Sequence, residues 1–277
     1  MTDRYAVIGN PVAHSKSPRI HAEFARQTRQ DIVYVRLAAP KRGFRQELDR
    51  FIAHGGRGLN VTVPFKQEAA AACKRVSERA NFAQAVNTLT FTEGTIVGDN
   101  TDGAGLLRDL EQNLRVELHG RRVLLLGAGG AARGIMMPLI ARGVRAIVVA
   151  NRDVGRARSL EERFGLFGSV RARSYDELAG AQYELVINAT SASLQGLVPP
   201  VPPSVFAPGC VAYDMVYAAG GRTPFLDLAA ECGALVTSDG LGMLVEQAAE
   251  SFFIWRGVRP QTAPVLELLR TAGIPAG

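Results

Sequence analysis

Residues 121–134, RRVLLLGAGGAARG, decide the fold of this 277-residue chain. The apolar run at 123–126 predicts a strand that is buried on both faces, and an apolar helical pattern begins at Ile135. Between the two lie glycines and other small residues, namely Gly127, Gly129, Gly130, Ala131 and Ala132. A glycine turn between a strand and a helix lets the backbone approach a phosphate, and the helix N-terminus offers free N–H groups to it. These five residues are therefore predicted to form a phosphate-binding loop.

A second apolar run, at 146–150, follows this loop at the distance of a strand–helix–strand unit. A dinucleotide-binding motif requires this context, which favours a bound dinucleotide over an ordinary turn between strand and helix.

The end of that second run indicates which dinucleotide is bound. An NAD site usually has Asp or Glu there, to accept hydrogen bonds from the ribose hydroxyls. This chain instead has Asn151, Arg152 and Asp153, with Arg156 next along. A guanidinium pairs with a 2′-phosphate through two hydrogen bonds, so the two arginines favour NADP, although a solvated helix face also explains Arg156. Asp153 is discordant, because it either caps the next helix or reaches the ribose and admits NAD.

Length and composition indicate a globular protein of one large or two modest domains, with 47% hydrophobic residues. The net charge is +6, and nearly all of the basic charge is arginine scattered among acidic residues. A basic stripe with interleaved aromatic residues, typical of nucleic-acid binding, is absent from the sequence. We therefore expect anionic small molecules as partners rather than nucleic acid.

The three cysteines are far apart, and the four histidines show no metal-ligand spacing, so neither a disulfide framework nor a metal site is expected. The N-terminus enters a strand at once, without the pattern of a signal peptide. Apolar runs stay well short of the roughly 20 residues that span a bilayer. These patterns predict a cytoplasmic protein without a membrane partner.

The apolar periodicity along the chain predicts an α/β fold with two lobes. Strands are expected at 5–8, 32–37, 58–63, 87–91, 95–97, 123–126, 146–150, 185–188, 211–217 and 234–237. One helix is expected after Ser17, with Ser17 as its N-cap and Pro18 at position N1. Further helices are expected at 44–52, 66–76, 106–114, 135–140, 241–255 and 265–269. A loop is expected at 197–208. The predicted domains are a first lobe at 1–103, a nucleotide-binding lobe at 104–239, and helices at 240–277 that pack back across the first lobe.

Polar residues gather at loops and strand ends of the first lobe, where they can line a cleft between lobes. They are Ser15 and Ser17, then Asn60, Thr62 and Lys66, then Asn87 and Thr88, and finally Asn100, Thr101 and Asp102. Hydroxyls and amides with one lysine and one aspartate suit a polyhydroxylated acid.

Lys66 and Asp102 are the reactive pair that we expect within this set. Oxidation of an alcohol with NADP moves a hydride to the cofactor and a proton to a base, and in the reverse direction Lys66 can donate to the ketone oxygen. From spacing alone other interpretations stay open: Ser17 as a helix cap, Lys66 as a solvated side chain, and Asp102 as a turn residue.

Nine motifs occur in the order seen in the shikimate dehydrogenase family, which the chain resembles over nearly its whole length. They are GNPVAHSKSPRIH (9–21), NVTVPFK (60–66), AVNTL (85–89), GDNTDGAG (98–105), GAGGAARG (127–134), NRD (151–153), NATSAS (188–193), YDMVY (213–217) and GLGMLVEQAAESFFIW (240–255). The resemblance implies a two-lobed fold, with an N-terminal α/β substrate domain and a Rossmann-like NADP-binding domain. It also implies NADP-dependent interconversion of 3-dehydroshikimate and shikimate in aromatic amino-acid biosynthesis.

The same resemblance implies roles for individual residues. Lys66 and Asp102 match the catalytic pair. Ser15 and Ser17 match residues that hold the substrate carboxylate, and further substrate contacts match Thr62, Asn87, Tyr217 and Gln247. The 2′-phosphate site matches Asn151 and Arg152 with Arg156 beside them, Thr190 lies in the cofactor motif NATSAS, and Gly240 and Met243 match residues near the nicotinamide. NADP-specific members commonly carry a small uncharged residue where this chain has Asp153, so selectivity for NADP over NAD stays open.

Two rival functions remain at this point. One is a relaxed quinate/shikimate dehydrogenase that also uses NAD, against which the serine pair argues. The other is a non-catalytic NADP-binding regulator of the same fold, against which the intact Lys66 and Asp102 argue. A monomer and a homodimer are both open, because the sequence shows no heptad pattern or long exposed apolar face.

Overall fold

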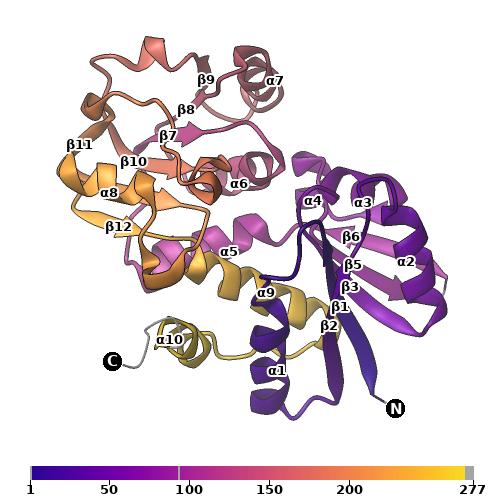
Figure 1. Ribbon diagram of the computed structural model, residues 1–277. Coiled ribbons are helices and arrows are strands. Elements are labelled where there is room, and N and C mark those ends of the chain that lie inside the picture. Colours follow the sequence, from indigo (N-terminus) through magenta and orange to yellow (C-terminus); the bar gives the residue numbers. More distant parts are fainter. Residues whose placement is uncertain (1, 93, 272–277) are drawn as a thin grey trace.

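Two six-stranded sheets, each with helices against it, form the two lobes of the chain (Figure 1). The computed structural model describes residues 2–92 and 94–271. Both lobes alternate strands and helices, as the apolar periodicity predicted, so the α/β, two-lobed fold class is confirmed.

The first sheet is mixed, with the order β2-β1-β3-β5-β6-β4. Its strands are β1 (Asp3–Gly9), β2 (Ile32–Ala38), β3 (Gly56–Val61), β4 (Arg75–Val76), β5 (Thr88–Thr92) and β6 (Thr95–Asp99). Only β5 runs against its neighbours, because β5 and β6 form the predicted hairpin; Glu93 in its turn lies outside the described residues. The helices of this lobe are α1 (Ser17–Thr28), α2 (Phe44–Ala53), α3 (Lys66–Ala72) and α4 (Glu78–Ala83).

The second sheet is parallel throughout its described pairs, with the order β12-β11-β10-β7-β8-β9. Its strands are β7 (Arg122–Leu126), β8 (Ala146–Ala150), β9 (Val170–Arg173), β10 (Tyr183–Asn188), β11 (Phe206–Asp214) and β12 (Val236–Ser238). Counted from β7, this is the strand order of the Rossmann fold, whose ligands bind beyond the carboxyl ends of the two central strands. The helices of this lobe are α6 (Gly130–Ala141), α7 (Val154–Phe164) and α8 (Pro224–Glu231).

Strand β7 is buried on both faces, as its apolar run predicted. Val123 and Leu125 pack into a cluster with residues of α6 and α7, whereas Leu124 and Leu126 pack with residues of α8 on the other face. All four side chains are completely buried. Burial of one such side chain contributes about 1.5–3 kcal/mol, so β7 is held in the middle of the sheet from both sides.

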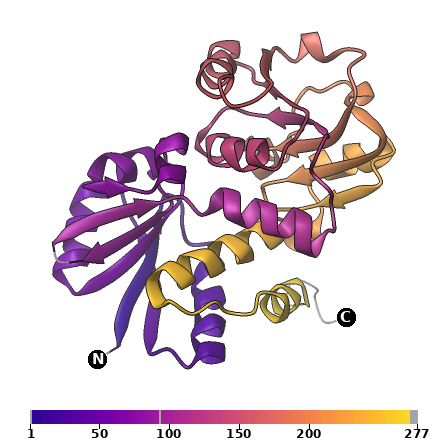
Figure 2. The ribbon, with the colours of Figure 1, turned by 180° about the vertical axis from the view of Figure 1, so that it is seen from behind.

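Two adjacent helices connect the lobes (Figure 2). They are α5 (Asp102–Arg108), which continues into the π-helical turn η1 (Asp109–Asn113), and α9 (Leu241–Arg256). Gly105 lets them approach closely, because a Cβ there would lie 2.7 Å from the Cβ of Gln247.

The C-terminal helices pack back on the first lobe, as predicted. Val245 and Phe252 of α9 lie in one buried cluster with Ile20 and Phe24 of α1, and α10 (Ala263–Thr271) adds Val265 to it. Short 3₁₀ turns complete the described structure: η2 (Asp176–Leu178), η3 (Ala192–Gln195), η4 (Pro203–Val205) and η5 (Ala219–Gly221).

Several predicted boundaries were wrong. Helix α1 begins at Ser17 itself, with Lys16 at the N-cap position, and the Ser17 hydroxyl accepts a hydrogen bond from Ser15 instead of capping. The helix predicted at 66–76 ends at Ala72, because the chain turns there to pair β4 with β6. Strand β11 takes up the end of the loop predicted at 197–208 and stops at Asp214.

Within the described residues, none of the helices has both the length and the hydrophobicity that crossing a bilayer requires. The same part of the chain holds no group of three or more His, Cys, Asp or Glu side chains placed to bind a metal ion.

Candidate functional site

The topology of the first sheet brings the predicted polar residues to one edge. Strands β1, β3 and β6 run in the same direction, so the segments that follow them meet at their carboxyl ends. Strand β5 runs in the opposite direction, so its first residue, Thr88, and the preceding Asn87 reach the same edge. The convergence that the sequence suggested is thus a consequence of strand direction.

Lys66 and Asp102 form an ion pair at this edge. Lys66 opens α3 and Asp102 opens α5, and the lysine Nζ lies 2.5 Å from the aspartate Oδ2. The lysine side chain is 19% exposed and the aspartate side chain 7%. The pair is therefore shielded from water on most sides, yet its ammonium group keeps access to solvent or a ligand.

Asn87 holds the second carboxylate oxygen of Asp102. Its side-chain nitrogen donates to Asp102 Oδ1 at 2.8 Å, while its side-chain oxygen accepts from the Thr101 N–H at 2.9 Å. Asp102 is thus fixed through both oxygens, by Lys66 on one side and by Asn87 on the other. Such a doubly held carboxylate can orient the lysine ammonium toward a reacting oxygen.

Gln247 reaches the same place from α9, far along the chain. Its Oε1 lies 3.3 Å from both the side-chain nitrogen of Asn87 and the hydroxyl of Thr101. Its side-chain nitrogen donates to the carbonyl of Leu244 at 2.8 Å, which fixes the orientation of the amide.

The serine loop lies beside a residue of the second lobe. Ser15 donates a hydrogen bond to Ser17 at 3.2 Å, and Arg36 Nε donates to the Ser15 carbonyl at 2.9 Å. Burial raises the pKa of Tyr217, while the adjacent Lys16 backbone and the Arg36 charge act in the opposite direction. Tyr217, which follows β11, also packs against the cluster of α1 and α9, and α1 begins at Ser17, at the end of this loop.

Thr62 follows β3 on the same edge of the first sheet. Its N–H donates to the Ile8 carbonyl at 2.9 Å, and its half-buried side chain packs on Gly9.

The glycine loop has the geometry of a phosphate cradle. Gly127 has a φ of +99°, which favours glycine, and a Cβ there would lie 3.1 Å from the Ala189 carbonyl and from the Thr190 methyl group. A Cβ at Gly129 would meet no other part of the described chain within 4 Å, so the space in front of this residue is open. Gly130 begins α6, whose first N–H groups have no partner within the helix, and Ala131 and Ala132 follow in its first turn. The loop therefore fits the pyrophosphate of a dinucleotide.

The residues after β8 confirm that Asp153 is a helix cap. Its Oδ1 accepts from the Gly155 N–H at 3.0 Å, and its Oδ2 lies 3.6 Å from Arg156 Nε. Asn151 donates to the Asp153 carbonyl at 2.8 Å, and Arg152 is exposed. Two guanidinium groups thus stand at the end of β8, one of them beside a carboxylate.

The segments after β10, β11 and β12 complete this side of the second lobe. Thr190 donates to the Asn188 side chain at 2.7 Å, Gly240 is the N-cap of α9, and Met243 is 6% exposed within the core. Asp214 lies in the motif YDMVY but had no predicted role; it is completely buried and accepts hydrogen bonds from Ser193 at 2.5 Å and Thr223 at 2.7 Å. Its position in the motif and at the end of a strongly apolar strand was the signal that could have identified it.

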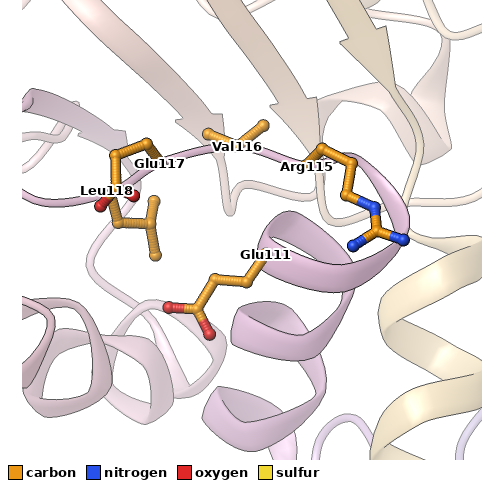
Figure 3. A pocket seen from close by; sticks show the side chains of 5 residues that line it. All are labelled: Glu111, Arg115, Val116, Glu117 and Leu118. Carbon is orange, nitrogen blue, oxygen red and sulfur yellow. The ribbon is translucent and has the colours of Figure 1, made fainter.

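A separate hollow of about 320 Å³ lies at the end of η1 (Figure 3). Glu111, Arg115, Val116, Glu117 and Leu118 line it. None of the predicted site residues lines this hollow.

Comparison with known families gives three matches along the chain. Residues 7–89 match the shikimate dehydrogenase substrate binding domain, residues 109–197 match shikimate / quinate 5-dehydrogenase, and residues 240–270 match the shikimate 5′-dehydrogenase C-terminal domain.

Individual relatives are similar over nearly the whole chain. The shikimate dehydrogenase (NADP(+)) of Nitrosospira multiformis is 55% identical over 272 residues, which cover 98% of each chain. An Ael1 enzyme from Pseudomonas putida has a crystal structure with a TM-score of 0.90 and 46% identity over 100% of both chains. Shikimate 5-dehydrogenase from Thermus thermophilus, solved in complex with NADP(H) and shikimate, has a TM-score of 0.87 and 33% identity over 98% of this chain and 100% of its own.

Proposed function

This chain belongs to the shikimate dehydrogenase family, and from that premise we propose that it catalyses the reversible, NADPH-dependent reduction of 3-dehydroshikimate to shikimate, a step of aromatic amino-acid (chorismate) biosynthesis. The observation that carries the proposal is the Lys66–Asp102 ion pair, held by Asn87 at the edge of the substrate lobe. The glycine loop of the other lobe fits the cofactor that such a reaction needs.

Lys66 and Asp102 handle the proton in this reaction. NADPH, when bound, supplies the hydride. As negative charge develops on the ketone oxygen, the Lys66 ammonium stabilises it and donates a proton, while Asp102 keeps the ammonium in position. In the oxidative direction the same pair takes up the proton of the alcohol.

The substrate is held by hydroxyl and amide groups. In this proposal Ser15 and Ser17 bind the carboxylate, and the ring hydroxyls contact Thr62, Asn87, Tyr217 and Gln247. The hydrogen bonds from Asn87 to Asp102 and from Asn87 to Gln247 support a binding surface that is organised before the substrate arrives.

The cofactor is held by the second lobe. Gly127, Gly129, Gly130, Ala131 and Ala132 receive the pyrophosphate. Asn151, Arg152 and Arg156 receive the 2′-phosphate, Thr190 contacts the cofactor, and Gly240 and Met243 lie beside the nicotinamide. The open space at Gly129 and the exposed guanidinium groups after β8 support this assignment.

We propose further that residues 1–103, 104–239 and 240–277 are the functional divisions of the chain. The protein would act in the cytoplasm on small molecules, as a monomer or a homodimer, without nucleic acid or membrane as partners. The scattered arginines support the exclusion of nucleic acid.

Initial rates test the proposal, with shikimate and quinate as substrates and NADP and NAD as cofactors. Activity confined to shikimate with NADP is the expected result. Turnover of quinate, or good rates with NAD, would favour the relaxed quinate/shikimate dehydrogenase, for which Asp153 beside Arg156 is the supporting observation. Folded protein without turnover in all four combinations would contradict catalysis and favour a regulator.

A further inference from the structure

Behind the Lys66–Asp102 pair lies a buried polar network that the proposed reaction does not use. It consists of Asn60 on β3, Thr88 on β5, Thr101 before α5 and Ser251 on α9. Asn60 is 7% exposed, Thr88 1%, and Thr101 and Ser251 are completely buried. Polar groups buried this deeply stabilise a fold only when they are hydrogen-bonded, so the arrangement of these four is tightly constrained.

Ser251 is the centre of the network. Its hydroxyl accepts from the Asn60 side-chain nitrogen at 3.0 Å and lies 2.8 Å from the Thr88 hydroxyl and 3.2 Å from the Thr101 hydroxyl. The Gln247 carbonyl, one turn back, lies 3.1 Å from the same hydroxyl. A hydroxyl has one proton to donate; since Thr88 donates its own proton to Asn87, the Ser251 proton joins the Ser251 and Thr88 hydroxyls.

The network reaches Asp102 through Asn87. The Asn87 side-chain oxygen accepts from the Thr88 hydroxyl at 2.9 Å and from the Thr101 N–H at 2.9 Å. These two bonds fix the plane of the amide, and the plane fixes the direction in which its nitrogen donates to Asp102 at 2.8 Å. Ser251 contacts both threonines, so it sets the orientation of the Asp102 carboxylate indirectly, first through the threonines and then through Asn87.

Packing of α9 does not require a hydroxyl at this position. The helix is held on α1 by Phe252 and Val245, and its neighbouring buried positions are Ala248 and Ala249. An alanine at position 251 would keep the apolar contacts of the helix and leave the hydrogen-bonding groups of Asn60 and the two threonines partly unpaired.

We infer that Ser251 is a positioning residue for the proposed reaction: it acts through Thr88, Thr101 and Asn87 to hold Asp102, and it touches neither substrate nor cofactor. The inference rests on the proposed function. Helix α9 would thus contribute to the catalytic geometry through Ser251 as well as through Gln247.

Ser251→Ala tests this inference, with Phe252→Leu as the control. Phe252 is the next residue of α9, is completely buried, and has no polar group that joins the network. We expect Ser251→Ala to lower kcat for shikimate oxidation by about tenfold, because the carboxylate that orients Lys66 is loosened, and to leave the KM for NADP within about twofold. Phe252→Leu should lower the Tm and leave kcat within about twofold of the wild type.

Two results would overturn the inference. One is a kcat of Ser251→Ala within about twofold of the wild type, and the other is an equal loss of kcat in both variants. If Ser251→Ala does not fold, Ser251→Cys replaces it, since the thiol has a similar shape and much weaker hydrogen bonds, and the same criteria apply. Absence of turnover in the wild-type protein would instead contradict the proposed function. Failure of the proposed function can therefore be told apart from failure of the inference about Ser251.

Discussion

Acid should destabilise this protein through His21, a residue away from the reacting groups. His21 is completely buried, its ring stacks on Tyr34 with centroids 4.1 Å apart, and Phe24, Phe252 and Trp255 surround it. Neither ring nitrogen has a hydrogen-bond partner in the part of the chain that the structure describes. Burial lowers the pKa of His21 from 6.5 to about 3 and outweighs the nearby Asn60 side chain, which acts in the opposite direction.

The sign and size of the effect follow from this shift. Between pH 6.5 and about pH 3 the unfolded chain binds a proton at His21 that the folded chain does not. The contribution of a neutral, buried His21 is fully present above pH 6.5 and is lost as the pH falls toward 3. At about 1.4 kcal/mol per pKa unit, a fall from pH 7.5 to about pH 5 lowers the free energy of unfolding by about 2 kcal/mol.

Urea unfolding at these two pH values measures the effect in the wild type and in His21→Phe. The phenyl ring keeps the stacking and cannot take up a proton, so the variant should lose about 2 kcal/mol less on acidification than the wild type. His54→Phe, at an exposed position, controls for the loss of an imidazole. All three proteins share the same carboxylates, so the effect of these groups on the free energy of unfolding cancels in the comparison. Equal losses in the wild type and His21→Phe would refute the argument.

Four further substitutions test the proposed site. Lys66→Ala should lower kcat by at least about a hundredfold while fluorescence titration shows unchanged NADPH binding, and near-normal turnover would remove Lys66 from the mechanism. Arg152→Ala should raise the KM for NADP far more than the KM for NAD, because only NADP carries the 2′-phosphate; equal effects would contradict that site. Asp153→Thr keeps a cap for α7 and removes a carboxylate near Arg156, so the ratio of kcat/KM for NADP to kcat/KM for NAD should rise. An unchanged ratio would contradict the idea that Asp153 competes with the 2′-phosphate for the Arg156 guanidinium. Ser15→Ala should raise the KM for shikimate about tenfold at constant Tm, whereas a lowered Tm alone would indicate a structural role.

The second lobe was predictable because its signals are local. The strand at 123–126 is apolar at every position, and a strand between two helical layers needs that pattern. The glycines that follow it include Gly127, whose positive φ few other residues adopt at low cost. Each of these features is contained in a few neighbouring residues, so the sequence carries them without knowledge of the rest of the fold.

Two short edge strands, β4 and β9, escaped prediction for the opposite reason. Strand β9 has four residues, VRAR, with charged side chains at alternate positions, and β4 has only two. Both obtain their structure from pairing with β8 and β6, which their own sequences do not encode. The same holds for the end of the helix predicted at 66–76, where pairing of β4 outweighs the helix propensity of an alanine-rich run.

Ser251 was beyond the reach of sequence patterns because its partners come from distant parts of the chain. It lies 191 residues from Asn60 and 150 from Thr101, and only the packing of α9 against the first lobe brings them together. In the sequence it is one serine in a largely apolar helix. The polar clusters before it were recognised as candidates, but the residue that links them was not.

The chemistry of this site is organised within one lobe. Lys66, Asp102 and Asn87 follow or begin strands of the first sheet, and Gln247 joins them from α9. In the described part of the chain, none of the hydrogen bonds that these side chains make reaches the glycine loop or the end of β8. Because α5 and α9 pack as closely as Gly105 permits, we expect the two connecting helices to move together rather than past each other. We therefore expect the reactive geometry to be preformed in the substrate lobe, with the other lobe bringing the cofactor to it.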